Sequence, residues 1–184
     1  MKNLHLAYLF FVVSTISFSQ NIESSTRKFI DEAQFTRINR WWGTLAEFKS
    51  GIGESVEFYP IEVINLKTGE KRKALQLDMH IKQPKEVFKT VWIGLEEINE
   101  FIRFIEDYVL PNLDIQLPID SSSEFVFKAK EMTLSYFIDN KRKRLTIKLN
   151  NYDDCLCLYK NYTFWTKTQV DKISKLLDIL KIIK

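Results

Sequence analysis

The chain carries two similar segments whose starting points are 72 residues apart, and this spacing limits the folds that it can adopt. The first segment, Val91–Tyr108, reads VWIGLEEINEFIRFIEDY, and the second, Thr163–Leu180, reads TFWTKTQVDKISKLLDIL. In each segment a candidate helix N-cap, Gly94 or Thr166, is followed by apolar residues at helical spacing. We therefore predict the same strand-to-helix unit twice.

The alignment of the two segments places residues of similar character together. Glu97 and Gln169 both take the third helical position, which in the second copy gives the spacing of a capping box. The aligned apolar pairs are Trp92 with Phe164, Ile98 with Val170, Phe101 with Ile173, and Ile105 with Leu177. The shared apolar positions predict helices that bury one face.

The same offset relates two predicted β-hairpins. In the first, strands over residues 56–66 and 71–81 flank a turn at Lys67–Glu70 that contains Gly69. The second hairpin turns at Asp139–Lys141, with strands predicted on both sides over residues 133–139 and 145–150. Further short strands are predicted over residues 44–48, 87–93, 125–130 and 155–159, and the first helix is predicted to stop before Pro111.

These patterns predict an α+β fold with two imperfect repeats of antiparallel strands followed by a helix. We expect one curved antiparallel sheet with both helices packed on one face and the opposite face left free. The predicted domain covers residues 44–184, with repeats over about 44–110 and 124–184 and a linker over 111–123. Residues 20–43 form an N-terminal segment whose structure the sequence does not indicate.

This plan resembles the duplicated sheet and two helices of the TATA-binding-protein-like folds. The chain also resembles uncharacterised small exported proteins of Bacteroidetes, in which a signal peptide ends before Gln and strands lead into a helix like Trp92–Ile98. That resemblance implies location and fold, and no activity. The plan is similar in outline to β-lactamase-inhibitory proteins, although the disulfides expected of that family are missing here.

Residues 1–19 have the features of a secretory signal peptide. Lys2 provides a short positive region, Leu4–Phe18 is mostly apolar, and Ser17 and Ser19 are the small residues that a signal peptidase reads. An uncleaved anchor or a buried core helix is the alternative. We expect export to the periplasm or the cell exterior, a mature chain that begins near Gln20, and no membrane span after cleavage.

The net charge and the two cysteines argue against a nucleic-acid-binding protein and against a redox or metal-binding cysteine pair. Removing Lys2 lowers the formal net charge from +3 to +2, so net charge does not predict nucleic-acid binding. Cys155 and Cys157 are two apart in a predicted strand, so both point to one face, and a bond between them would be strained. We interpret them as small buried residues, since a redox or metal role needs further ligands that the neighbouring sequence lacks.

The sequence contains few of the residue patterns that indicate an enzyme. His80 is the only histidine after the predicted signal peptide, and neither a catalytic triad nor a spacing that supports a dyad with Cys157 is present. Glu96 and Glu97 fit the first turn of a helix better than an acid/base pair. Phosphate loops, zinc spacings and calcium loops are missing from the sequence. We predict no cofactor, no metal and no enzymatic activity; a hydrolytic enzyme that uses His80 is the least favoured alternative.

Two features suggest contact residues for a binding module. The first is Trp41 and Trp42, because adjacent strand residues point to opposite faces and at most one ring is normally buried. Their alternative role is core packing and cover by the N-terminal segment. The second feature is the basic hairpin ends, Lys71, Arg72 and Lys73, and Arg142, Lys143 and Arg144 after Lys141.

The basic ends suggest paired patches for anionic groups, although ordinary solvated turns have the same composition. The leading hypothesis is a module that binds a protein partner through the free sheet face. A carrier or binder of an anionic envelope ligand or lipid is the alternative.

Overall fold

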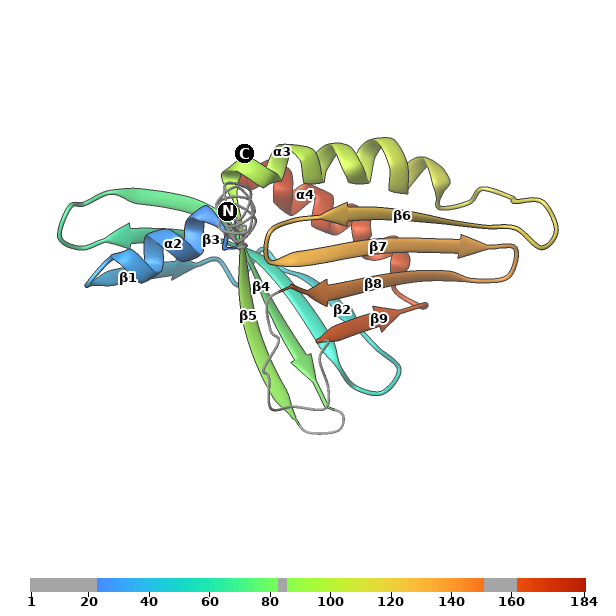
Figure 1. Cartoon of the computed structure of the whole chain (residues 1–184), viewed down its shortest axis with the longest axis horizontal. Coiled ribbons are helices and arrows are strands. Elements are labelled where there is room, and N and C mark those ends of the chain that lie inside the picture. The colour runs from blue at the N-terminus through green and yellow to red at the C-terminus, as the bar shows by residue number, and fades with distance from the viewer. Residues whose placement is uncertain (1–22, 83–85, 151–161) are drawn as a thin grey trace, which may run out of the picture.

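A computed structural model describes residues 23–82, 86–150 and 162–184 and has an α+β fold with two antiparallel sheets (Figure 1). The predicted α+β class is confirmed. Sheet A has the strand order β1-β3-β4-β5, with β2 also beside β3, and consists of β1 (Thr36–Arg40), β2 (Ala46–Lys49), β3 (Ser55–Asn65), β4 (Lys71–Ile81) and β5 (Val87–Gly94). Sheet B has the order β6-β7-β8-β9 and consists of β6 (Ser122–Lys128), β7 (Met132–Asp139), β8 (Lys143–Leu149) and β9 (Thr163–Thr166).

Among the described residues, three α-helices accompany the sheets: α2 (Ser25–Glu32), α3 (Leu95–Arg103) and α4 (Ile173–Ile183). The chain stays helical after α3, first as a π-helix over Phe104–Val109 and then as a 3-10 turn over Leu110–Asn112. α3 ends at Arg103 and the π-helix at Val109, so the first helix stops before Pro111 as predicted, and only the 3-10 turn includes this residue. Pro111 is tolerated because it stands in the first turn of the 3-10 segment, where its missing N–H removes no hydrogen bond.

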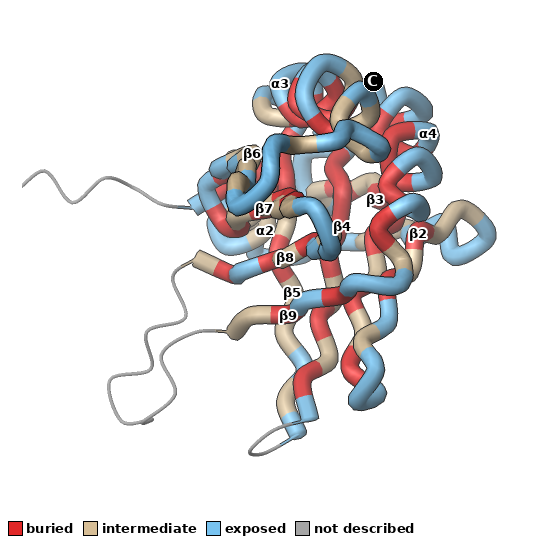
Figure 2. The backbone as a smooth tube through the Cα atoms, turned by 90° about the vertical axis from the view of Figure 1, so that its right-hand side faces the viewer, coloured by how far each residue is buried: buried red, intermediate tan, exposed pale blue. Residues whose placement is uncertain are grey.

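Both sheets and both helices α3 and α4 contribute to one contiguous hydrophobic core. Buried and less buried residues alternate along β7 and β8, as a strand with one covered face requires (Figure 2). The core contains, among others, Phe48, Phe58, Leu77, Ile93, Phe101, Leu134, Ile147, Phe164, Leu176 and Leu180.

The expectation of one continuous sheet was wrong, because sheets A and B are separate. The physical reason lies at the outer edge of β5, whose backbone groups bond to side chains instead of to another strand. The N–H of Trp92 donates to Glu131 Oε2 at 3.2 Å, and the carbonyl oxygen of Thr90 accepts from Arg27 Nη2 at 3.4 Å. Side chains therefore cap the edge at which a strand of sheet B would have continued sheet A.

The two hairpins follow the sequence prediction closely. β3 and β4 pair antiparallel from Ser55 opposite His80 to Ile64 opposite Lys71, and Gly69 takes a positive φ of 75° in the turn. β7 and β8 pair from Met132 opposite Leu149 to Ile138 opposite Lys143. The predicted strand over residues 155–159 lies outside the described residues.

The second helix begins later than the repeat predicted. Thr166 is the buried last residue of β9, and Gln169 precedes a 3-10 turn over Val170–Lys172 that leads into α4. The capping box was therefore wrong in the second copy, and Gln169 Oε1 instead accepts the backbone N–H of Lys49 at 2.7 Å. Such a tertiary bond competes directly with a local cap for the same side chain.

The offset of 72 residues matches the helices better than the strands before them. Ile98 and Val170 are both buried in the common core, as are Phe101 and Ile173. Trp92, by contrast, packs against a second cluster on the other face of sheet A, whereas its aligned residue Phe164 lies in the common core. That the two units of strands and helix are copies of one another therefore stays a prediction.

The N-terminal segment covers part of the outer face of sheet A. Phe29 of α2 is buried with Tyr59, Ile61, Val63 and Ala74 in the second cluster. Ser24 is the N-cap of α2, and its hydroxyl accepts the N–H of Arg27 at 3.1 Å. The face that we expected to stay free is thus partly covered in sheet A.

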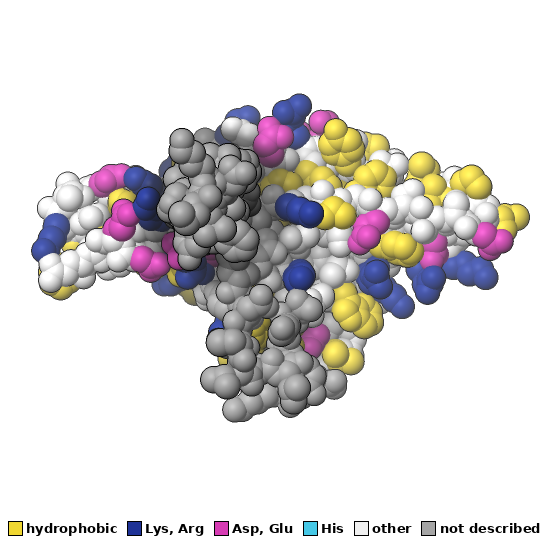
Figure 3. All heavy atoms as spheres, viewed as in Figure 1, with side chains coloured by type: hydrophobic (Ala, Val, Ile, Leu, Met, Phe, Trp, Pro, Cys, Tyr) yellow, Lys and Arg dark blue, Asp and Glu magenta, His cyan; other side chains and the backbone are white. Residues whose placement is uncertain are grey.

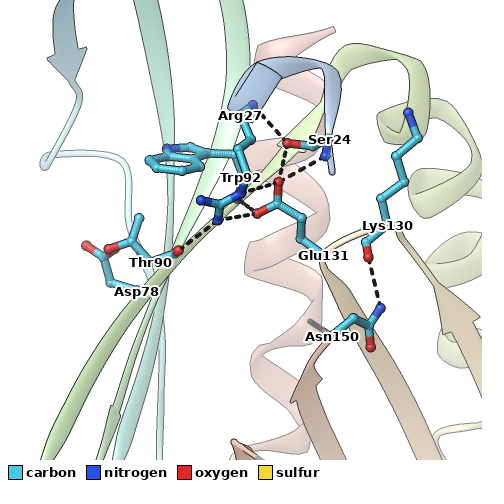
Figure 4. A network of polar contacts seen from close by, with 8 residues as sticks. All are labelled: Ser24, Arg27, Asp78, Thr90, Trp92, Lys130, Glu131 and Asn150. Carbon is cyan, nitrogen blue, oxygen red and sulfur yellow. Dashed lines mark hydrogen bonds and ion pairs between the residues drawn. The ribbon is translucent and has the colours of Figure 1, made fainter. Parts of the chain in front are cut away.

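A buried carboxylate joins α2 to both sheets (Figure 4). Glu131, in the turn between β6 and β7, is only 2% exposed. Its Oε1 accepts from Ser24 N at 3.0 Å, Ser24 Oγ at 2.6 Å and Arg27 Nε at 3.0 Å. Its Oε2 accepts from Arg27 Nη2 at 2.8 Å and from Trp92 N at 3.2 Å. Five donors therefore compensate the buried charge.

The predicted signal peptide over residues 1–19, the start of the mature chain near Gln20, and the pair Cys155 and Cys157 lie outside the described residues. Among the helices that the structure does describe, none has the length and apolar character needed to cross a membrane.

Candidate functional site

The outer face of sheet B is an open surface of the described fold. Its side chains turn away from α3, α4 and the common core, and each of them is exposed or half-buried. Figure 3 shows hydrophobic and cationic side chains on this face, which looks toward the viewer at the right of the molecule. We call this surface the platform, and it consists of Glu124, Val126, Lys128, Thr133, Ser135, Phe137, Arg144, Thr146, Lys148, Thr163 and Trp165.

The strand register arranges the platform in rows that run across the sheet. One row contains Lys128, Thr133, Lys148 and Thr163, because these residues are paired from strand to strand. The next row contains Val126, Ser135, Thr146 and Trp165, and the third contains Glu124, Phe137 and Arg144. Two aromatic rings and three cations thus surround a centre of hydroxyl groups.

Cations exceed carboxylates on the platform. The guanidinium of Arg144 lies 5.2 Å from the centroid of the Phe137 ring, and Lys167 Nζ lies 5.5 Å from that of Trp165. Within residues 23–82, 86–150 and 162–184, Lys128, Arg144, Lys148 and Lys167 make no ion pair with a carboxylate. Glu124 is the acidic side chain in the rows, so the local charge is positive.

A hollow of about 830 Å³ continues the platform toward the turn between β7 and β8. Its lining combines Phe137 with the exposed Ile119 and with the turn residues Lys141 and Arg142. Asp139 accepts two hydrogen bonds from Arg142, from Nε at 2.9 Å and from Nη2 at 2.7 Å, and these bonds lower the pKa of Asp139. Arg142 is therefore already neutralised, and Lys141 is the cation in this hollow without an ion pair in the described structure.

Trp41 lies at a second, much smaller site, beside the end of α4. Here a pocket of about 140 Å³ is lined by Trp41, Thr44, Pro60, Ile61, Lys73, Ile182 and Ile183. Trp41 is 45% exposed and Ile182 is 63% exposed, so the apolar walls reach the surface. The structure thus brings together two of the predicted contact residues, Trp41 and Lys73.

Trp41 and Trp42 lie in the turn between β1 and β2 and not in a strand, so the expected alternation of adjacent strand residues does not apply to them. Trp42 packs on the outer face of sheet A. Its ring centroid lies 4.5 Å from that of Tyr59, and 58% of its surface stays exposed. Tyr59 donates a hydrogen bond to Asp78 and accepts one from Gln76 Nε2 at 2.6 Å. Burial, together with the bond to Asp78, raises the pKa of the Tyr59 hydroxyl. These polar groups satisfy one another beneath Trp42.

The two basic hairpin ends do not form one patch, because they lie at opposite ends of the longest axis (Figure 1). Arg72 pairs with Glu70 at 3.0 Å, and its guanidinium lies 4.5 Å from the centroid of the Phe29 ring. Lys143 pairs with Asp114 at 2.7 Å. Lys71 lines a hollow of about 470 Å³ together with Arg72, Lys73, Glu62 and Glu96, so acidic groups accompany this basic end.

His80 lies near the end of β4, away from these sites. Its Nε2 lies 2.8 Å from Glu86 Oε1, and its ring stacks on Phe88 with centroids 4.3 Å apart. Among the residues that the structure describes, the side chain of His80 has no other hydrogen-bond partner. Its candidate partner Cys157 lies outside them. Within all the residues that the structure describes, no group of three or more His, Cys, Asp or Glu side chains is placed to hold a metal ion.

Sequence reasoning missed most of the platform. Arg144 is the one platform residue that was predicted, whereas Phe137, Lys148 and Trp165 were not. The signal was present in the alternation of β7 and β8, where the polar or cationic positions fall on the face opposite to Leu134 and Ile147. Comparisons with protein-family models, with curated proteins and with solved structures found no match to this chain.

Proposed function

We propose that this protein is a non-enzymatic binding module and that the platform on sheet B is its binding surface. The observation that supports this proposal is the outer face of sheet B, which no described residue covers, with the half-exposed ring of Phe137 and with Trp165, 44% of which is exposed. Aromatic residues and Arg are enriched in interfaces, and both are present here.

The architecture behind the platform suits a binding role. The opposite face of the same strands is buried in the common core, through Leu134, Tyr136, Leu145 and Ile147. The backbone under the platform is therefore fixed by packing that involves α4, and its side chains keep a constant spacing. A rigid display of this kind lowers the entropic cost of binding an extended partner.

The test is native mass spectrometry on the full chain purified gently from its host, with Trp165→Ala compared with the unaltered protein. A bound mass that is present in the unaltered protein and lost in Trp165→Ala supports the platform as the binding surface. Lys175→Ala, on the exposed side of α4, is the matched control and should keep the bound mass. The same bound mass in Trp165→Ala would refute this assignment.

A second candidate is a protein partner that inserts one apolar side chain into the pocket beside Trp41. The volume of about 140 Å³ is below the range of small-molecule sites, roughly 300–1,000 Å³, and close to a cavity of roughly 150 Å³ that holds benzene. Such a pocket suits a single hot-spot side chain. If a protein partner is identified, Trp41→Ala and Ile182→Ser should each weaken its binding, whereas Trp165→Ala should not.

We also propose that the protein is exported and that residues 1–19 are its cleaved signal peptide. Residues 1–19 combine a positive start, an apolar stretch and small residues before Gln20. N-terminal sequencing of the protein recovered from intact cells tests this part. A chain that begins at Gln20 supports export, whereas a chain that keeps Met1 contradicts cleavage.

A further inference from the structure

The cations of the platform are widely spaced, both across the strands and along β8. Lys128 and Lys148 lie in one row with Thr133 between them, because Thr133 is paired with both. Two strand spacings separate their Cα atoms, which gives about 10 Å. Arg144 lies four residues before Lys148 on β8, which gives about 13 Å along the strand.

Neutral hydroxyl and apolar groups fill the space between these cations. Ser135 and Thr146 occupy the centre of the middle row, between Val126 at one end and Trp165 at the other. A hydroxyl group both donates and accepts hydrogen bonds, so this row suits a ligand that also carries hydroxyl groups. The ring of Trp165 offers an apolar face at the end of the row.

This spacing discriminates between classes of linear anion. Nucleic acids carry one charge for about every 3.4 Å of each strand in a duplex, and a run of acidic residues in an extended peptide carries one for about every 3.4 Å. Either would place several charges between Lys128 and Lys148, where the platform offers Thr133 and no cation. The spacing matches a polymer whose charged units alternate with neutral, hydroxyl-bearing units.

We propose that the ligand of the platform is an acidic polysaccharide in which carboxylated sugars alternate with neutral sugars. The carboxylates pair with Lys128, Lys148 and Arg144, the sugar hydroxyls bond to Ser135 and Thr146, and one sugar ring lies on Trp165. This inference rests on the proposed function, since it names the chemical class that the platform binds. The modest excess of positive charge over the whole chain, +3, is also lower than a nucleic-acid-binding domain usually carries.

The experiment measures tryptophan fluorescence of the full chain during titration with hyaluronate, whose glucuronate units alternate with neutral sugars. We expect saturable binding that weakens as the salt concentration rises, because the ion pairs are exposed to solvent. Polygalacturonate, which is charged at every unit, should bind more weakly, and neutral dextran should not bind.

Three variants assign this binding to the platform. Lys128→Ser/Lys148→Ser should weaken the affinity about tenfold through the loss of two exposed ion pairs. Trp165→Ala should weaken it by roughly the same factor, while Trp165→Phe, which keeps an aromatic face, should restore most of the affinity. Lys67→Ser/Lys71→Ser is the charge-matched control at the opposite end of the molecule, where both side chains are exposed, and it should bind as the unaltered protein does. Circular dichroism checks that every variant is folded.

Two kinds of result would overturn the inference. One is the absence of hyaluronate binding, and the other is binding that is equal in Lys128→Ser/Lys148→Ser and the unaltered protein. If oligo(dT), polyglutamate or anionic vesicles bind instead and the platform variants abolish that binding, the proposed function stands and only the polysaccharide is wrong. If the platform variants also keep the bound mass seen by native mass spectrometry, the proposed function fails as well.

Discussion

Replacing Glu131 with Gln tests whether the buried carboxylate holds α2 and the two sheets together. Glutamine has nearly the same shape, but its amide nitrogen donates hydrogen bonds where a carboxylate oxygen accepted them. If the amide nitrogen takes the place of Oε2, it meets two donors, Arg27 Nη2 and Trp92 N, which now lie 2.8 and 3.2 Å from Oε2. If it takes the place of Oε1, it meets three donors from Ser24 and Arg27.

The smaller of these losses sets the expected magnitude. Two hydrogen bonds to a charged acceptor are lost, and each contributes about 1.5 kcal/mol at the low end of the usual range. Arg27 also loses its carboxylate partner while its side chain is 24% exposed, so water compensates part of that loss. We therefore expect Glu131→Gln to lower the free energy of unfolding by about 3 kcal/mol, a large share of the roughly 5–15 kcal/mol that a domain has.

Urea unfolding at neutral pH, followed by circular dichroism, measures this difference. Glu100→Gln is the control, because Glu100 pairs with Arg103 at 3.1 Å on the surface, where both side chains are about two-thirds exposed. That pair should contribute less than about 0.5 kcal/mol. If Glu131→Gln unfolds at the same urea concentration as the unaltered protein, the five hydrogen bonds do not stabilise the fold and this reasoning is wrong.

Three further predictions concern the turn and two titrating groups. Gly69→Ala should cost about 1 kcal/mol because φ is 75° in the first hairpin turn, and thermal unfolding measures it. Burial and the neighbouring carboxylates of Glu47 and Asp78 raise the pKa of Glu57, so its charge is disfavoured in the fold, and Glu57→Gln should slightly raise the melting temperature at pH 7. Burial raises the pKa of Tyr136 to about 12, so its contribution to stability is complete below pH 10 and is lost as the pH rises toward 12. Absorbance titration of Tyr136→Phe against the unaltered protein should show one late-ionising tyrosine fewer.

Local patterns in the sequence were sufficient to predict the two β-hairpins. Leu75, Leu77 and Met79 alternate with more polar residues, and all three are buried on one face of β4. The turn at Gly69 also follows from local chemistry, since glycine readily adopts a positive φ. Information of this kind is contained within about ten residues, so reasoning from the sequence finds it.

The division into two sheets depends on contacts that no local pattern contains. Arg27 and Glu131 are 104 positions apart, and either alone looks like an ordinary surface charge. For the same reason, the alignment that placed Trp92 on Phe164 drew attention away from the next residue, Trp165. A shift of one position along a strand moves a side chain to the opposite face, so the aromatic residue of the platform was missed.

The contact between Ser24 and Glu131 also has a consequence for the order in which the fold forms during synthesis. The two residues are 107 positions apart, so α2 cannot take its final place on sheet A until the ribosome has made the turn after β6. Contacts of such long range are generally made late, because the intervening chain must first be organised. Helix α2 therefore completes its contacts only after the chain has been made as far as Glu131, which is long after its own residues have left the ribosome.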